Sequence, residues 1–282
     1  MVNLHDSLAH PQLRSRVWEY FGVEFDPQFV TDTPLNVIPD GAIKLMFHRK
    51  PMEGVTGLRL IGNHTRQRSI MPTGGDKYWA VQVVPGTAAT WLPGLTDCIT
   101  LRNTICNAAD ILGEWATMLC KRLQSCESFQ ESVAIFDEAL LPLLPQAKPL
   151  DEAVMRAVEA IVHASGEISS SDLVARVGLS ERQLLRRFTC AVGLTPKQFS
   201  RAWRIFSATV QATRTQRLCW SAIAAELGFS DQAHLSHEFV DLLGLTPQQF
   251  AQQRHTNFYN VYAAEPLWNP DSTDAPNALA HH

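Results

Sequence analysis

The chain has 282 residues, with 24 Lys and Arg against 28 Asp and Glu, so its formal net charge is −4 at pH 7. At about 100 to 200 residues per domain, this length predicts two domains. Apolar residues make up 45% and charged residues 18%, which excludes a generally disordered chain and favours packed cores. Taken alone, the net charge argues against a polyanionic partner such as nucleic acid.

The sequence has no uncharged apolar run of 18 residues, and its first residues lack the basic-then-apolar layout of a signal peptide. We therefore expect a cytoplasmic protein without a membrane partner. The cysteines form no CxxC pair, so reduced thiols are expected. Cys120 and Cys126 are expected to be small buried side chains, with a redox sensor as the alternative. The six cysteines are Cys98, Cys106, Cys120, Cys126, Cys190 and Cys219.

The first part of the chain has strand and turn signals. Short apolar or alternating runs lie at residues 34–48, 58–63 and 78–92, and Pro-Gly or Gly-Gly turns interrupt them. From about residue 104 to 141 the apolar spacing becomes helical. We therefore predict an N-terminal domain over 1–145 with a mixed, barrel-like sheet followed by helices.

A proline-rich segment follows. Residues 140–150 (LLPLLPQAKPL) hold three prolines, each of which removes a backbone donor and disfavours helix in the preceding residue. We place the interdomain linker here. Beyond it, residues 151–164 form a predicted amphipathic helix with Val154, Val158 and Ile161 in step.

The C-terminal half contains an internal repeat. Residues 173–199 return at 223–250, with an offset of 50 at Gly178/Gly228 and 51 from Leu184/Leu235 onward, so the second copy has one inserted residue. The paired positions are Gly178/Gly228, Ser180/Ser230, Leu184/Leu235, Phe188/Phe239, Gly193/Gly244, Thr195/Thr246, Pro196/Pro247 and Phe199/Phe250.

Each copy predicts two short helices joined by a tight turn, which is a helix-turn-helix pattern. In the first copy, Ser169 and Ser180 are expected N-caps, and Gly178 and Gly193 are expected helix ends. Thr195 then caps a helix that begins with a proline. In the second copy the recognition helix is expected to start at Ser230.

These signals predict an α+β protein whose C-terminal domain, residues 151–253, is all-helical. Its first helix-turn-helix unit spans about 170–192 and its second about 220–243. A long helix over 196–213, with Phe199, Trp203 and Phe206 on one face, joins them. Residues 264–282 are expected to be a flexible tail.

The charge is unevenly distributed. From residue 176 to 217 there are nine basic residues and one acid, a local charge of +8, so the rest of the chain carries −12. A solvated face is the usual explanation of a charge run. Here the basic residues coincide with a duplicated helix-turn-helix, and cationic side chains neutralise DNA phosphates. The sequence therefore favours DNA binding.

In the first unit, Leu184 and Phe188 form the core stripe, so Arg182, Leu185 and Arg186 project together from another face. Arginine can contact guanine through two hydrogen bonds, and Leu185 could pack on a thymine methyl group. The side chains assigned to phosphate contact are Arg187, Lys197, Arg201 and Arg204.

In the second unit the outward residues are Gln232, Ala233, Ser236 and His237. Residues 218–254 contain one base and four acids, a local charge of −3. We therefore expect asymmetric DNA contact, with most of the affinity from the first unit. For His234 and His237, a plain surface role is an alternative to base contact.

The motifs GLS-x3-L-x-R-x-F-x4-G-LTP and GFSDQ-x2-L-x3-F-x4-G-LTP closely resemble those of the AraC/XylS family of transcription regulators, over about residues 151–253. The resemblance implies a seven-helix DNA-binding domain whose two recognition helices enter successive major-groove segments. It also implies that the seven outward residues named above face the bases. The sequence departs from the family at His237, where Arg is usual, and at Cys219, where a capping Ser or Thr is common.

In this family the N-terminal domain commonly senses a small molecule or mediates dimerisation. The segments IPDGAIKLMF and VVPGTAATWLPGL resemble a β-rich sensor subgroup. No cofactor or metal is expected, because His48 and His64 are isolated. Tyr78, Trp79 and Trp91 could line a pocket, but aromatic residues on strands are more often core.

The leading hypothesis is a transcription regulator that binds double-stranded DNA, as activator or repressor, and is not an enzyme. RNA polymerase, a small-molecule effector and a second copy of the chain remain open as partners. One alternative is a DNA-repair or other enzyme domain fused to the same DNA-binding region. This sequence lacks the cysteine spacing and the catalytic motifs that such a domain needs. Another is an N-terminal domain that serves only for oligomerisation.

Overall fold

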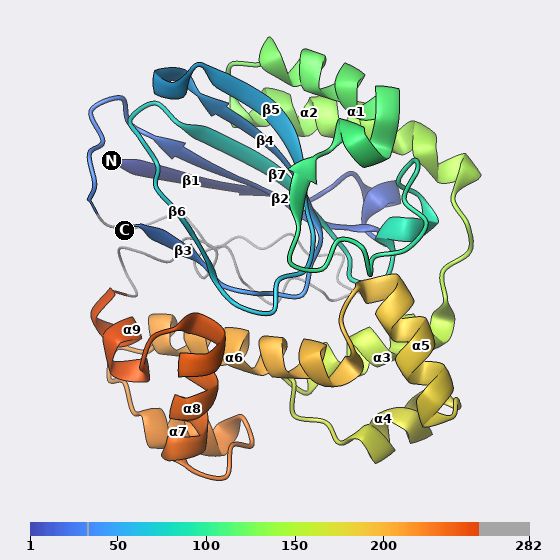
Figure 1. The fold of residues 1–282 in the computed structure, drawn as a ribbon, viewed down its shortest axis with the longest axis vertical. Helices are drawn as coiled ribbons and strands as arrows, with labels where there is room; N and C mark the ends of the chain where they lie inside the picture. Colours follow the sequence, from blue (N-terminus) through green and yellow to red (C-terminus); the bar gives the residue numbers. More distant parts are fainter. Residues whose placement is uncertain (33, 254–282) are drawn as a thin grey trace.

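The computed structural model describes residues 1–32 and 34–253, in which a β-rich N-terminal part lies above a layer of helices (Figure 1). A six-stranded antiparallel sheet has the order β1-β2-β7-β4-β5-β8, and β3 and β6 form a separate antiparallel pair. The strands are β1 (Val2–Ser7), β2 (Val17–Phe25), β3 (Leu35–Val37), β4 (Lys44–Lys50), β5 (Val55–Ile61), β6 (Arg68–Ile70), β7 (Lys77–Val83) and β8 (Ile105–Asn107).

The strand signals of the sequence correspond to β3, β4, β5 and β7 but miss the first two strands of the sheet. β2 lies inside the sheet between β1 and β7, and seven of its nine residues are buried. Because both of its faces are covered, it lacks the apolar-polar alternation that marks a strand with one wet face. The sheet is therefore larger than those strand signals alone predict.

Two helices, α1 (Ala109–Gln124) and α2 (Phe129–Leu140), cover one face of the sheet (Figure 1). Between sheet and helices lie Phe47, Trp79 and Phe136, all fully buried. The Tyr20 hydroxyl of β2 donates to Asp137 Oδ1 of α2 at 2.6 Å. The β-then-α order of this part is as predicted, except that the start of the expected helical range forms β8.

The described residues of the C-terminal part form helices joined by short loops, with no strand among them. Its helices are α3 (Glu152–His163), α4 (Ser170–Val177), α5 (Glu181–Val192), α6 (Pro196–Arg214), α7 (Trp220–Glu226), α8 (Gln232–Leu243) and α9 (Pro247–Gln253). The long connecting helix is α6, and its Phe199, Trp203 and Phe206 are buried as predicted. The remaining helices are the short 3-10 turns η1 (Pro11–Leu13), η2 (Pro51–Glu53), η3 (Ala88–Thr90) and η4 (Leu141–Gln146). The expected tail, 264–282, lies outside the described residues.

Helix caps explain where these helices begin. The side chains of Ser169, Ser180 and Thr195 accept hydrogen bonds from the backbone of the first turn, as predicted. The prediction for Ser230 is wrong, because the N-cap of α8 is Asp231, whose carboxylate accepts from His234 N at 2.7 Å. The inserted residue of the second copy moves the cap by one position.

The two parts pack closely. Trp18 of β2 stacks on Trp203 of α6 with ring centroids 5.4 Å apart, and Ile38 lies in the helical core. At Gly41 a side chain would place its Cβ 2.3 Å from Phe199, so only glycine permits this approach. The linker predicted over residues 140–150 contains the 3-10 helix η4, and the division into two domains there stays a prediction.

All six cysteines are free thiols; Cys126 is buried as expected, whereas Cys120 is only half-buried. Across the described residues, no helix has the length and apolar character needed to cross a membrane.

Candidate nucleic-acid interface

The first unit consists of α4 and α5, and its buried stripe fixes which side of α5 faces outward. Leu184 and Phe188 are 3% and 0% exposed and pack into the helical core. Arg182, Leu185 and Arg186 are consequently exposed together on the opposite side. The two guanidinium groups make no hydrogen bond or ion pair with any residue in 1–32 or 34–253. They are therefore available to a ligand from outside the chain.

The four residues predicted to contact phosphate differ in their surroundings. Lys197 is exposed and has no ion pair within the described residues. Arg201, in contrast, forms ion pairs with Glu238 and Asp241 of α8. The Arg204 guanidinium donates to the Gly166 carbonyl at 3.0 Å and lies 5.3 Å from the centre of the Phe229 ring.

The fourth, Arg187, joins α5 to the start of α3. Its Nε and Nη2 donate to the two carboxylate oxygens of Asp151 at 2.7 and 2.5 Å. Asp151 also caps α3 through the backbone N–H of Val154. Burial alone would raise the pKa of Asp151, but the hydrogen bonds from Arg187 and the backbone outweigh it and lower that pKa. Arg187 thus has a structural partner that its sequence neighbours do not reveal.

The second unit consists of α7 and α8, which bury Leu235 and Phe239. Gln232, Ala233 and His237 are exposed, and Ser236 is half-buried with its hydroxyl donating to the Gln232 carbonyl at 2.8 Å. These are the predicted outward residues. They present amide, methyl, hydroxyl and imidazole groups, and no permanent positive charge.

His234 has a local structural role. Its Nδ1 accepts from the Ser230 backbone N–H at 3.3 Å, and its ring meets Phe229 edge to face at 5.4 Å. These contacts give His234 a structural role that the sequence did not predict, whereas His237 is exposed.

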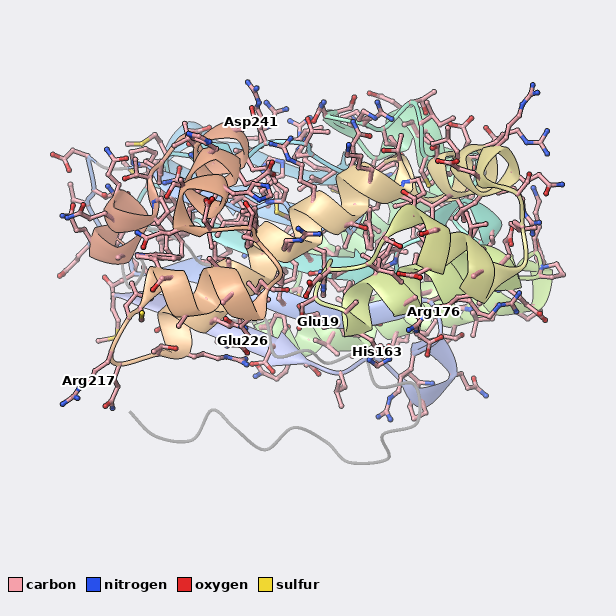
Figure 2. The ribbon with its side chains drawn as sticks, turned by 90° about the horizontal axis from the view of Figure 1, so that it is seen from below. Glu19, His163, Arg176, Arg217, Glu226 and Asp241 are labelled. Atoms are coloured by element: carbon pink, nitrogen blue, oxygen red, sulfur yellow. The ribbon has the colours of Figure 1, made fainter. Side chains whose placement is uncertain are left out.

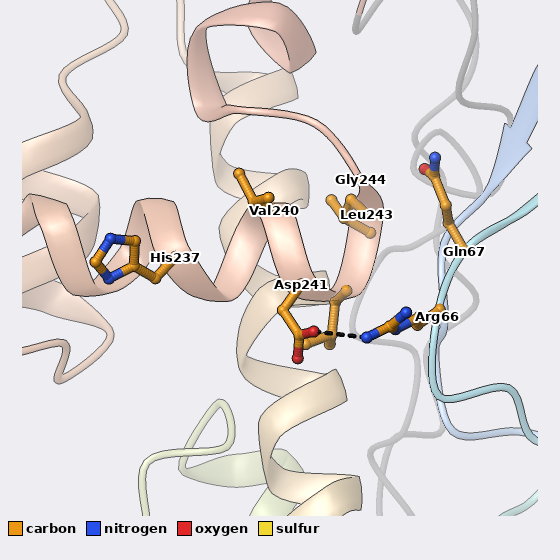
Figure 3. A pocket seen from close by; sticks show the side chains of 8 residues that line it. Arg66, Gln67, His237, Val240, Asp241, Leu243 and Gly244 are labelled. Atoms are coloured by element: carbon orange, nitrogen blue, oxygen red, sulfur yellow. Dashed lines mark hydrogen bonds and ion pairs between the residues drawn. The ribbon is translucent and has the colours of Figure 1, made fainter.

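Acidic side chains on α8 are neutralised from two other elements. Glu238 and Asp241 pair with Arg201 of α6, and Arg66, from the connection between β5 and β6, donates to Asp241 Oδ1 at 2.9 Å (Figure 3). Arg66 and Asp241 also line a pocket of about 510 Å³, together with His237 and Val240. Sequence reasoning missed Arg66, because it lies 175 residues from Asp241 and no local pattern connects the two.

The start of α7 lacks a side-chain cap. Cys219 occupies the N-cap position, and its thiol forms no capping hydrogen bond. The first turn of α7 therefore lacks the hydroxyl cap that Ser180 provides in the first unit.

The N-terminal sheet holds a buried polar cluster near the helical layer. Glu19, Gln82 and Lys44 are neighbours on β2, β7 and β4, and Lys44 pairs with Asp40 at 2.5 Å. Glu19 Oε2 is buried and has no hydrogen-bond partner among the described residues. Burial, with the nearby carboxylates of Asp40 and Asp6, raises the pKa of Glu19 to about 8.

The other candidate residues of the N-terminal part do not form a site. Tyr78, Trp79 and Trp91 are at most 6% exposed and belong to the cores. Burial lowers the pKa of His48 and that of His64, the latter to about 4. No group of three His, Cys, Asp or Glu side chains suited to a metal occurs in the part of the chain that the structure describes.

Residues 173–253 match a protein family described as a helix-turn-helix domain. One similar solved structure is a transcriptional regulator of Chromobacterium violaceum with an AraC-type DNA-binding domain, at 26% identity over 37% of this chain and 94% of that chain, with a TM-score of 0.35. ToxT of Vibrio cholerae is similar at 11% identity over 89% of this chain and 97% of that one, with a TM-score of 0.39. A structure of Vibrio cholerae ToxT bound to (E)-4-(8-methylnaphthalen-1-yl)but-3-enoic acid is similar at 10% identity over 90% of this chain and 98% of that chain, with a TM-score of 0.40.

No curated protein sequence matches the chain. Residues 173–253, which match the family model, form a helix-turn-helix domain.

Proposed function

We propose that this chain is a sequence-specific transcription regulator that binds double-stranded DNA and is controlled by its N-terminal domain. The proposal rests on the guanidinium groups of Arg182 and Arg186, which are exposed and have no partner within the described residues. Both lie on α5, the second helix of the first of two helix-turn-helix units. A helix of this kind places its outward side chains against base edges in the major groove.

The base-facing residues in this proposal are those of the two outward faces. Arg182, Leu185 and Arg186 act from α5, and Gln232, Ala233, Ser236 and His237 act from α8. Lys197 contacts phosphate. Arg187, Arg201 and Arg204 act mainly inside the protein, because each already has a partner there.

Control by the N-terminal domain, residues 1–145, rests on its close packing against the DNA-binding domain, residues 151–253. Trp18 of β2 stacks on Trp203 of α6, so a shift of the sheet would act directly on α6. A small-molecule effector, a second copy of the chain and RNA polymerase are the partners proposed for this control. The proposed setting is the cytoplasm, and no catalytic role is assigned.

The test is genome-wide mapping of the DNA that the protein binds, with a variant carrying Arg182→Ala and Arg186→Ala as control. Discrete bound sites that disappear in the variant are the expected result. Unchanged occupancy in the variant would overturn the assignment of α5 as the main recognition helix.

A further inference from the structure

Both recognition helices have their C-terminal ends held by the N-terminal domain. The last four carbonyl groups of a helix have no partner within that helix and need donors from elsewhere. For α5 and α8 several of these donors come from two loops of the N-terminal part, residues 62–67 and 98–103. We call these two loops the helix-end bridge.

At the end of α5 the bridge supplies three donors. The backbone N–H of Cys98 donates to the Cys190 carbonyl at 2.9 Å, Asn63 Nδ2 to the Val192 carbonyl at 2.5 Å, and Arg102 Nε to the Gly193 carbonyl at 2.9 Å. Gly193 has a φ of +84°, and a Cβ there would lie 2.5 Å from the Cys98 carbonyl oxygen. The loop is thus pressed against the helix end.

At the end of α8 the bridge supplies one donor and one charge. The Gln67 backbone N–H donates to the Leu242 carbonyl at 2.8 Å. Arg66 pairs with Asp241 at 2.9 Å, and its side chain is 74% exposed (Figure 3). The outward residue His237 lies on the same helix, in the same pocket.

The two loops form one unit. The Asn103 backbone N–H donates to the Asn63 carbonyl at 2.9 Å, and the Thr65 backbone N–H donates to Asn103 Oδ1 at 2.9 Å. A Cβ at Gly62 would lie 1.8 Å from the Leu101 carbonyl oxygen, so the loops touch. Asn63 and Gln67, four residues apart, therefore connect α5 and α8 through one short stretch of chain.

α5 and α8 are also connected through α6, because they lie near its opposite ends (Figure 1). Figure 2 agrees, since it shows Arg176 of the first unit and Asp241 of the second on opposite sides of α6. The bridge provides a second connection between the two units, from the side of the N-terminal domain.

We propose that the helix-end bridge positions the two recognition helices for DNA. Asn63 and Gln67 fix the separation of the two helices. Arg66 balances the charge of Asp241 near the DNA-facing side of α8. Two linked binding units gain affinity only when their separation matches that of their sites. A fixed separation therefore makes the protein selective for the spacing of two half-sites. This inference rests on the proposed function.

The test uses a DNA fragment recovered by the mapping experiment and derivatives with one, two or five base pairs inserted between its half-sites. We compare the full-length protein with a variant carrying Asn63→Ala and Arg66→Ala. The variant is expected to bind the native fragment at least about tenfold more weakly and to lose less affinity on insertion than the wild type does. Footprinting should show a larger loss of protection over the second half-site.

The matched control is Arg122→Ala, which also removes one exposed, ion-paired arginine, but one whose ion pair is with Glu138 inside the N-terminal domain. It should keep wild-type affinity and spacing dependence. If the double variant does not fold, Arg66→Gln replaces it, because this side chain is mostly exposed and its removal leaves the core intact. The single variant is expected to lose protection of the second half-site only.

Tighter binding by the variant, or wild-type affinity with wild-type spacing dependence, would overturn the inference and leave the proposed function standing. If the wild type itself binds none of the recovered fragments, the proposed function and the inference are both overturned.

Discussion

The two helix-turn-helix units have the same framework and different chemistry. Both bury a Leu and a Phe four residues apart on the recognition helix, and both end that helix at a glycine with a positive φ. The first unit exposes two guanidinium groups that have no partner within residues 1–32 and 34–253. The second exposes neutral groups, and two acids on its recognition helix, Glu238 and Asp241, are already paired with arginines from other elements. A repeat therefore preserves the residues that build the fold while the outward residues diverge.

From this difference we infer that the first unit supplies most of the DNA affinity. The formal charge from residue 176 to 217 is +8, whereas residues 218–254 carry −3. Because phosphate neutralisation supplies sequence-independent affinity, binding should weaken steeply as salt rises, despite the overall charge of −4.

The largest expected effect is that of Arg182→Ala combined with Arg186→Ala. Each bidentate arginine–guanine contact is worth about 1 to 3 kcal/mol of discrimination, so binding should weaken by roughly 30-fold to 10⁴-fold. The measurement is the dissociation constant for a mapped DNA site at fixed salt. The unfolding temperature should not change, since both side chains are exposed and unpaired. A loss smaller than that of Gln232→Ala would reverse the ranking of the two units.

The next effect concerns Arg201, whose two ion pairs hold α6 to α8. Arg201→Met should lower the free energy of unfolding by about 1 to 2 kcal/mol, because it leaves the Glu238 carboxylate without its cation and leaves Asp241 with Arg66 alone. Urea unfolding without DNA measures this. Lys197→Ala is the contrasting variant: it should leave stability unchanged and reduce the slope of log affinity against log salt by about one. Unchanged stability together with a reduced salt slope in the Arg201 variant would instead support a phosphate contact.

A smaller effect is expected at the uncapped start of α7. Cys219→Ser supplies a hydroxyl that can accept from the first turn, and a good N-cap is worth about 0.5 to 2 kcal/mol. The midpoint of thermal unfolding should rise. Cys190→Ser, an exposed cysteine that is not at a helix start, serves as control and should bring no gain. A gain of equal size in both variants would show that capping is not the cause.

The smallest effect is that of Arg187→Ala, because its pair with Asp151 is partly exposed and worth about 1 kcal/mol or less. The folded-state pKa of Asp151 is lowered, so the pair stabilises the protein above the ordinary aspartate pKa and this stabilisation is lost as the pH falls through the lowered value. The free energies of unfolding of wild type and variant, measured from pH 7 downward, should therefore become equal at acid pH. A difference that persists there would exclude the pair as its cause.

The helical half of the molecule is largely predictable from sequence because its signals are local. The caps Ser169, Ser180 and Thr195 and the buried faces of α5 and α6 follow from spacing alone. The one error, at Ser230, arises because the insertion changes the offset between the copies just before the recognition helix.

The N-terminal part is less predictable because its determinants are distant in sequence. β2 is covered on both faces and shows no alternation, and its neighbour β7 is more than 50 residues away. The same reason hides the partners of Arg187 and Arg201 and the whole helix-end bridge. Sequence locates exposed side chains on a helix well, but a folded structure is needed to show which of them are already paired.

The central claim, unequal contributions of the two units, is tested most directly by comparing Arg186→Ala and His237→Ala on one mapped DNA site at one salt concentration. We predict that Arg186→Ala weakens binding by at least several-fold more than His237→Ala. A larger loss for His237→Ala would contradict the account and make the second unit the dominant source of affinity.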